Sequence, residues 1–301
     1  MSLHSKYLVL ILTALSIGLT GCCGLNTIQP VNVGPPSLKS TGIPIDYLPA
    51  LKGGYFQTVS EATDRKYHIY IRLPEGYDRQ ENRRYPVVYL LDGDSLFPLL
   101  APTHLFLTYD EQLPEAVIVG ISYGGFDTSI NKRHIDFSAP AADAPPGEDG
   151  APGFLSFLKD ELLPTVEIRY NIDPSKRVLV GQSRGGYFVL WSALEAPDLF
   201  WGRIASNPSF TPGRTRFFAD ASPHSRGDLK VVLASGSRDT ELRKRNAIEW
   251  TQTWQHRADA PWQVKLSVIQ GGTHAASIGE TYRQAMLWLF SEDIALPTSG
   301  K

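Results

Sequence analysis

The stretch RVLVGQSRGGYFVLWSAL, residues 177–194, decides the fold. Its first five residues form an apolar run of strand length, and a helix-compatible segment opens at Gly185. Between them Ser183 lies in the pattern G-x-S-x-G, where we expect a side chain at Gly181 or Gly185 to strike neighbouring backbone. A tight turn between strand and helix lifts a serine hydroxyl above the end of a sheet. The pattern predicts that Ser183 is a catalytic nucleophile; the alternative is an ordinary turn in a non-catalytic sheet.

Strand and helix patterns alternate along the rest of the chain. One strand alternates apolar and polar residues, as a half-buried strand does, and two others are continuous apolar runs that suit strands covered on both faces. Expected strands are 65–74, 85–94, 115–122, 177–181, 229–236 and 262–270, and expected helices are 153–170, from 185 on, 241–255 and 278–290. This order predicts one α/β domain with a mostly parallel twisted sheet and helices on both faces.

Two further patterns bear on the interior and on the loops. The helix expected at 153–170 carries an apolar stripe of Phe154, Phe157, Leu158, Leu162 and Val166. The stretches 137–153 and 209–228 are rich in turn residues. Loops of this length inside a compact domain usually belong to lids or binding sites.

A serine nucleophile needs a base and an acid that orients it. His274 lies in a glycine-rich loop after the last expected strand, the place in the chain order that fits the base. Asp239, after the strand 229–236, is our choice for the acid. Glu241 is a second candidate, and Asp239 and Thr240 also suit the N-cap of the following helix. A Ser–His pair without an acid is a third alternative, since some serine hydrolases work in that way. The acid therefore stays open.

Acyl transfer also needs two backbone N–H donors for the oxyanion. One is expected from Arg184, the residue after the serine. The other is expected from Gly93 or Asp94, where glycine lets the chain turn after the apolar run at 85–91.

The N-terminus differs from the body of the chain. A short polar start precedes an apolar run, residues 7–19, that is too short to span a bilayer comfortably. The following LTGC, residues 19–22, resembles the lipobox of bacterial lipoproteins, which implies a lipid on Cys22. We predict a lipoprotein signal peptide at 1–21, a flexible tether at 22–50 and a catalytic domain at 51–295, anchored in the bacterial cell envelope at the periplasmic face of a membrane. An ordinary signal peptide with incidental cysteines is the alternative.

Composition excludes several other functions. The 301 residues carry a formal net charge of −2 without a block of like charge, which argues against nucleic-acid binding. Both cysteines lie at positions 22 and 23, so the body of the chain has no disulfide framework and no thiolate metal site. Metal-binding and phosphate-binding motifs are also missing from the sequence. The chemistry expected of Ser183 needs neither a metal nor a cofactor.

Several motifs, taken in order, resemble the esterase D and enterochelin-esterase-like branch of the α/β hydrolases. They are YPVVYLLDGD, IVGISYG, RHIDFSAP, FLKDELLPTVEIRYNIDPSKRVLVGQSRGG, SNPSF and GGTHAAS, spread over residues 55–290. The resemblance implies the α/β-hydrolase fold and serine ester hydrolysis, with Ser183 and His274 in catalytic positions. It also implies a substrate-binding role for Arg133, and it leaves the choice between Asp239 and Glu241 open.

Arginines near the expected site point to a small-molecule substrate. Arg184 departs from the apolar or aromatic residue common after the nucleophile in this branch. Together with Arg133 and Arg238, it either recognises an anionic acyl or leaving group, as siderophore esters carry, or is a solvated or paired charge without a role in binding. Two alternatives remain: an acyltransferase that uses the same acyl-enzyme, and a non-catalytic siderophore-binding lipoprotein.

Overall fold

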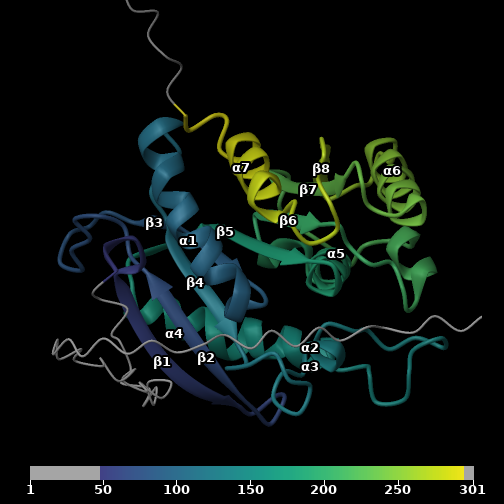
Figure 1. The fold of residues 1–301 in the computed structure, drawn as a ribbon, viewed down its shortest axis with the longest axis horizontal. Helices are drawn as coiled ribbons and strands as arrows, with labels where there is room; N and C mark the ends of the chain where they lie inside the picture. The colour runs from purple at the N-terminus through teal and green to yellow at the C-terminus, as the bar shows by residue number, and fades with distance from the viewer. Residues whose placement is uncertain (1–47, 295–301) are drawn as a thin grey trace, which may run out of the picture. The chain divides into compact units, whose positions relative to one another are not determined.

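The computed structural model describes residues 48–294. Their strands form one eight-stranded sheet (Figure 1). The strand order is β1-β2-β4-β3-β5-β6-β7-β8. β2 pairs antiparallel with β1 and β4, and all other neighbours are parallel. The strands are β1 (Gly53–Ser60), β2 (Arg65–Arg72), β3 (Tyr85–Leu90), β4 (Val117–Ser122), β5 (Ile172–Gln182), β6 (Gly202–Ser206), β7 (Leu229–Gly236) and β8 (Trp262–Ile269). The predicted α/β architecture is confirmed.

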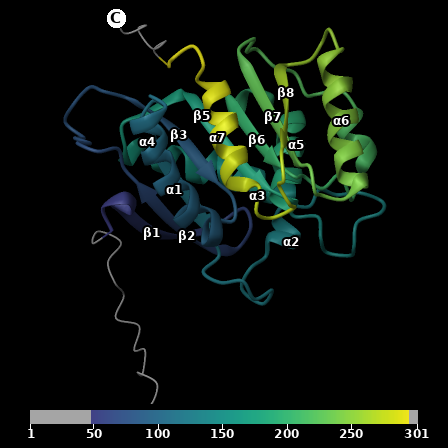
Figure 2. The same ribbon diagram turned by 45° about the horizontal axis from the view of Figure 1, so that its top comes forward.

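Helices cover both faces of this sheet. They are α1 (Gly93–Asp110), α2 (Arg133–Asp136), α3 (Ala151–Ser156), α4 (Leu163–Arg169), α5 (Arg184–Glu195), α6 (Glu241–Gln255) and α7 (Ile278–Leu289). α1 and α7 lie side by side on one face, where they pack on Val88 and Leu90 (Figures 1 and 2). α3, α4, α5 and α6 pack on the other face, around Val87 and Tyr89. Alternate residues of β3 thus point into two separate apolar layers.

The strands β1 and β6 and the helices α1 and α2 are not among the elements predicted from the sequence. α1 contains Pro98 and Pro102. Proline lacks the N–H of a helical hydrogen bond and normally interrupts a helix, so the pattern of this segment does not predict one. The short strand β6 lies between β5 and β7, with all five residues buried.

The helix expected at 153–170 is interrupted by a π-helical turn, η3 (Phe157–Leu162), between α3 and α4. Pro164 is the second residue of α4, two positions after the end of this turn. A proline has no N–H, and its ring clashes with the carbonyl four residues earlier. The interruption of the α-helical hydrogen-bond pattern thus lies directly before the turn that contains this proline. The predicted apolar stripe is fully buried: Phe154, Phe157, Leu158, Leu162 and Val166.

The described residues start close to the predicted domain boundary, and β1 begins at Gly53. The predicted signal peptide, the anchor residue Cys22 and the tether as far as residue 47 lie outside them. Within 48–294 no helix is long and apolar enough to cross a membrane. Part of the loop expected at 209–228 belongs to the interior, because the 3-10 turn Arg214–Phe218 buries Phe217 completely.

Candidate active site

Ser183 occupies a sharp turn between β5 and α5. Its φ of 55° and ψ of −111° lie in a region that residues with a side chain rarely adopt. Its N–H donates to the carbonyl of Ser206 (2.9 Å), and its own carbonyl accepts from Tyr187 (2.9 Å) and Ser209 (3.0 Å). These backbone bonds to β6 and to the segment after it hold the strained serine in place.

The two glycines of the motif make different contacts. A Cβ on Gly181 would lie 2.4 Å from the carbonyl oxygen of Gly185, so only glycine fits there. At Gly185 the nearest neighbour would be a carboxylate oxygen of Asp92, at 3.1 Å, rather than backbone. The expected backbone clash is therefore present at the first glycine and wrong for the second.

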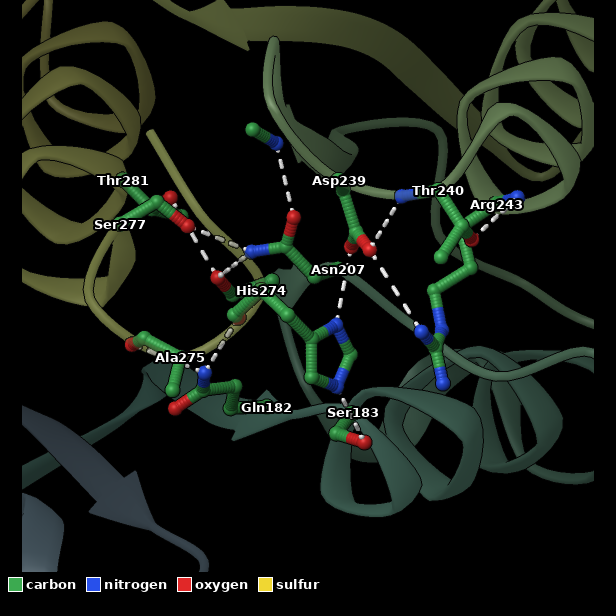
Figure 3. Close-up of polar contacts among 12 residues, drawn as sticks. Gln182, Ser183, Asn207, Asp239, Thr240, Arg243, His274, Ala275, Ser277 and Thr281 are labelled. Carbon is green, nitrogen blue, oxygen red and sulfur yellow. Dashed lines mark hydrogen bonds and ion pairs between the residues drawn. The ribbon is translucent and has the colours of Figure 1, made fainter. Parts of the chain in front are cut away.

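Ser183, His274 and Asp239 form one continuous hydrogen-bonded chain (Figure 3). The imidazole Nε2 lies 3.0 Å from the Ser183 Oγ, and Nδ1 lies 2.9 Å from the Asp239 Oδ2. The three side chains come from loops after β5, β7 and β8, which are parallel neighbours or next neighbours, so their carboxyl ends share one edge of the sheet.

Asp239, and not Glu241, contacts the histidine. Glu241 is the first residue of α6, exposed at its side chain and paired with Lys244. The N-cap of α6 is Thr240, whose side chain accepts the N–H of Arg243 (3.4 Å). Because Thr240 supplies the cap, the Asp239 carboxylate is left to contact the imidazole.

The environment of Asp239 keeps its carboxylate ionised. Burial raises the pKa of this group, since a charge is costly away from water. The hydrogen bonds from His274 and from the Thr240 N–H (2.7 Å), together with the charge of Arg243, outweigh burial and hold the pKa of Asp239 below its usual value. An ionised carboxylate at this position fixes the imidazole tautomer and stabilises the imidazolium.

Two polar side chains position the histidine loop. Gln182 donates its amide N–H to the carbonyls of His274 (2.7 Å) and Ala275 (3.0 Å). The buried Asn207 donates to the Ser277 hydroxyl (2.6 Å) and accepts the N–H of Gly236 (2.7 Å), which ties the loop to the end of β7. Neither residue is predicted from the sequence, although each lies in a motif that carries the family resemblance.

The backbone N–H groups expected to hold an oxyanion belong to the first residues of two helices. Arg184 opens α5, while Gly93 and Asp94 open α1. N–H groups in the first turn of a helix lack an acceptor within that helix, and the helix dipole favours negative charge there. A Cβ on Gly93 would lie 2.7 Å from the backbone nitrogen of Ile121, so this glycine lets α1 start against β4.

A pocket of about 280 Å³ opens beside Ser183 and His274. It is lined by Asp92, Asp94, Ser95, Leu96, Phe126, Asn131, Arg133, Gln182, Ser183, His274 and Ala275. Among residues 48–294, no group of three or more His, Cys, Asp or Glu side chains is placed to hold a metal ion.

Arg133 faces this pocket, as expected, but its charge is already paired. Its Nε and one terminal nitrogen donate to both carboxylate oxygens of Asp92, at 2.7 and 3.0 Å. Burial lowers the pKa of Arg133, but the bond and charge of Asp92 outweigh it and raise that pKa. Asp92, which precedes α1 with φ of 52°, is a pocket residue that sequence reasoning missed.

Arg184 and Arg238 lie outside the pocket lining, and in this structure they fit the alternative of a paired or solvated charge. The Arg184 guanidinium donates to the His134 carbonyl (2.9 Å), the Ser138 hydroxyl (2.9 Å) and Glu148 (2.5 Å), in the loop 137–153. Arg238 is exposed, and neither arginine lines the pocket. Glu148 thus neutralises the charge that the sequence seemed to offer to a substrate.

A serine, a histidine and a buried aspartate joined in this order at the carboxyl edge of a mostly parallel sheet define a serine hydrolase of the α/β-hydrolase fold. The chain belongs to the esterase family: the family model described as "Esterase: Putative esterase" matches residues 60–288. The family resemblance of the sequence motifs is confirmed.

Similar proteins include esterases of known substrate. The chain is 32% identical over 208 residues to ferri-bacillibactin esterase BesA of Bacillus subtilis, an alignment that covers 62% of this chain and 70% of BesA. It is 31% identical over 140 residues to the apo-salmochelin esterase of Escherichia coli, covering 43% of each chain. The solved structure of the BES protein from Bacillus cereus superposes with a TM-score of 0.68 at 22% identity, covering 78% of this chain and 94% of that one. This last likeness shows the fold.

Proposed function

We propose that this esterase hydrolyses siderophore-type carboxylic esters through an acyl-enzyme on Ser183. The observation that carries the proposal is the hydrogen-bonded chain from the Ser183 Oγ through His274 to the buried Asp239. The substrate class is supported by relatives that are named as esterases of ferri-bacillibactin, of apo-salmochelin and, in Aspergillus fumigatus, of the siderophore triacetylfusarinine C.

The geometry supports a two-step reaction. The His274 Nε2 takes the proton from the Ser183 hydroxyl while Oγ bonds to the ester carbonyl carbon. The carbonyl oxygen becomes an oxyanion and accepts from the N–H of Arg184 and from that of Gly93 or Asp94. His274 then gives its proton to the departing alcohol oxygen. Water, deprotonated by His274, repeats the attack and releases the carboxylic acid, which restores the serine.

Asp239 acts through His274 in both steps. It accepts the imidazole Nδ1–H, which leaves Nε2 free to take the serine proton. Its depressed pKa means that the carboxylate stays charged when His274 becomes positive. The negative charge then stabilises the imidazolium without taking its proton.

We also propose that the mature protein is held in the bacterial cell envelope by a lipid on Cys22. The support is the LTGC sequence that ends at this residue. Membrane fractions of cells that express the full chain test the proposal. Cys22→Ser should release the enzyme from the membrane, while Cys23→Ser, the neighbouring cysteine, should leave it attached.

Labelling with a fluorophosphonate tests the catalytic proposal. The intact mass of the wild-type protein should rise by one adduct, and Ser183→Ala and His274→Ala should abolish the adduct. Ser225→Ala removes an exposed serine and serves as the matched control. A folded wild type that stays unlabelled would contradict the proposed nucleophile. Transfer of the acyl group to an added alcohol in place of water would contradict hydrolysis.

A further inference from the structure

Phe126 is an exposed aromatic residue at the catalytic pocket. Its relative exposure is 75%, yet it lines the same pocket as Ser183 and His274. It lies in the segment that joins β4 to α2. An aromatic side chain left in water at the mouth of a pocket offers apolar area that a ligand can cover.

The backbone around Phe126 is fixed from two sides. The Asp94 carboxylate accepts the N–H of Tyr123 (2.9 Å) and of Gly124 (2.8 Å). On the other side, the side-chain amide of Asn131 donates to the carbonyl of Gly125 (3.1 Å). Both Asp94 and Asn131 line the pocket themselves. The ring is therefore presented by a turn that the pocket residues hold in place.

Gly124 makes this turn possible. Its φ of +91° suits glycine alone, and a Cβ there would lie 2.9 Å from the ring of His68 on β2. The chain leaves β4 at this turn, two residues before Phe126. The exposed Phe126 thus follows a constrained turn of the backbone.

Charge does not compete with the ring for the substrate. Arg133 is bound by both oxygens of Asp92, and Asp94 is bound by two backbone N–H groups. Asp92, Asp94 and Arg133 are the acidic and basic side chains, other than the histidine, among the residues that line the pocket, and each is already partnered. The largest exposed apolar side chain among the residues that line this pocket is Phe126.

We propose that Phe126 forms a subsite for an aromatic ring of the ester substrate, next to the scissile bond. The inference rests on the proposed hydrolysis at Ser183 and adds its specificity. Aromatic pairs prefer offset-stacked or edge-to-face contact, which favours an aromatic ring over an aliphatic group of equal size. Phe126 touches the substrate without taking part in proton transfer.

Three methyl esters test this subsite by proton release: methyl phenylacetate, methyl cyclohexylacetate and methyl acetate. Phe126→Ala should lower kcat/KM for the phenyl ester about tenfold, mostly through KM, and for methyl acetate less than about twofold. The cyclohexyl ester should fall between them. Phe126→Trp keeps an aromatic face and should retain the preference for the phenyl ester.

Phe106→Ala is the matched control, because Phe106 on α1 is also exposed (58%) but does not line the pocket. It should change none of the three rates. Equal losses on all three esters, or no loss on the phenyl ester, in Phe126→Ala would overturn the subsite while hydrolysis stands.

A binding measurement separates this result from failure of the proposed function. The Kd of phenylacetamide, measured by ligand-observed NMR, needs no turnover. It should rise about tenfold in Phe126→Ala and stay unchanged in Phe106→Ala. If the wild type hydrolyses none of the esters, the proposed function falls, and this Kd alone supports or overturns the aromatic subsite.

Discussion

Asp239 and Asp136 are both buried carboxylates, but their pKa values shift in opposite directions. Their side chains are 1% and 0% exposed. Burial raises the pKa of each. At Asp239 the bonds from His274 and the Thr240 N–H prevail, and the pKa falls below its usual value.

At Asp136 burial prevails. This carboxylate accepts from the hydroxyls of Tyr67 (2.8 Å) and Tyr123 (2.9 Å) and pairs with Arg65 (2.6 Å). Each of these contacts lowers the pKa of Asp136, but together they do not offset burial, and the pKa is raised. Burial alone therefore does not determine the direction in which the pKa of a carboxylate shifts. Asp136 ends α2, the short helix that begins with Arg133, so it anchors a pocket element rather than taking part in the reaction.

The largest expected effect separates the two carboxylates by activity. Asp239→Asn should lower kcat/KM by about 10³-fold or more, because an amide neither fixes the required tautomer nor stabilises the imidazolium. Asp136→Asn should stay within about tenfold of the wild type. Initial rates on methyl acetate measure both. Similar losses of kcat/KM in Asp239→Asn and Asp136→Asn would contradict the assignment of a catalytic role to Asp239 and a structural role to Asp136.

The second effect concerns stability. Asp136→Ala should lower the free energy of unfolding by about 2–4 kcal/mol, because it removes the acceptor of the buried Tyr123 hydroxyl and of Arg65 and one of two partners of the Tyr67 hydroxyl. Urea denaturation measures this loss. Asp228→Ala breaks an exposed ion pair with Arg226 and is the control, with an expected loss below about 1 kcal/mol. The prediction fails if the two variants are equally stable.

The third effect is a dependence of stability on pH. The pKa of Asp136 is higher in the folded than in the unfolded protein, so stability is lost as pH rises from about 4 through the folded pKa. The depressed pKa of Asp239 has the opposite sign: its contribution is present above about pH 4 and is lost as pH falls through the folded pKa.

Unfolding of the wild type and both Asn variants between pH 3.5 and pH 7 tests these signs. Relative to the wild type, Asp136→Asn should gain stability as pH rises, by about 1.4 kcal/mol for each unit by which the two pKa values differ. The stability of Asp239→Asn should rise relative to that of the wild type as pH falls, because the wild type loses the contribution of the Asp239 carboxylate. Parallel curves for all three proteins would contradict both assignments.

The sequence predicts those parts of the site that short motifs encode. The turn at Ser183 follows from two glycines between a strand and a helix, and His274 follows from its place after the last strand. The fold class follows from the alternation of apolar runs with helical patterns. By contrast, α1 could not be predicted, because Pro98 and Pro102 disfavour a helix locally. The helix forms nevertheless, because it packs against β4 and α7.

Pairs of charges could not be predicted in the same way. Arg133 and Asp92 lie 41 residues apart, and Arg184 and Glu148 lie 36 residues apart. Which arginine faces the pocket depends on how the loop 137–153 packs, and that loop carries no periodic pattern. A charge count from the sequence therefore overestimates the positive charge offered to a substrate.

The smallest expected effect concerns Asp92, the carboxylate that neutralises Arg133 at the pocket. Asp92→Asn keeps a residue that tolerates the φ of 52° but removes the charge that holds Arg133. The ratio of kcat/KM for monomethyl succinate to that for methyl butyrate should rise about fivefold, equivalent to a charge interaction of about 1 kcal/mol. Glu148→Gln releases Arg184 instead and should leave this ratio unchanged, because Arg184 lies outside the pocket lining. An equal rise in both variants would mean that the field of the whole site, and not the Asp92–Arg133 pair, sets the preference for charge.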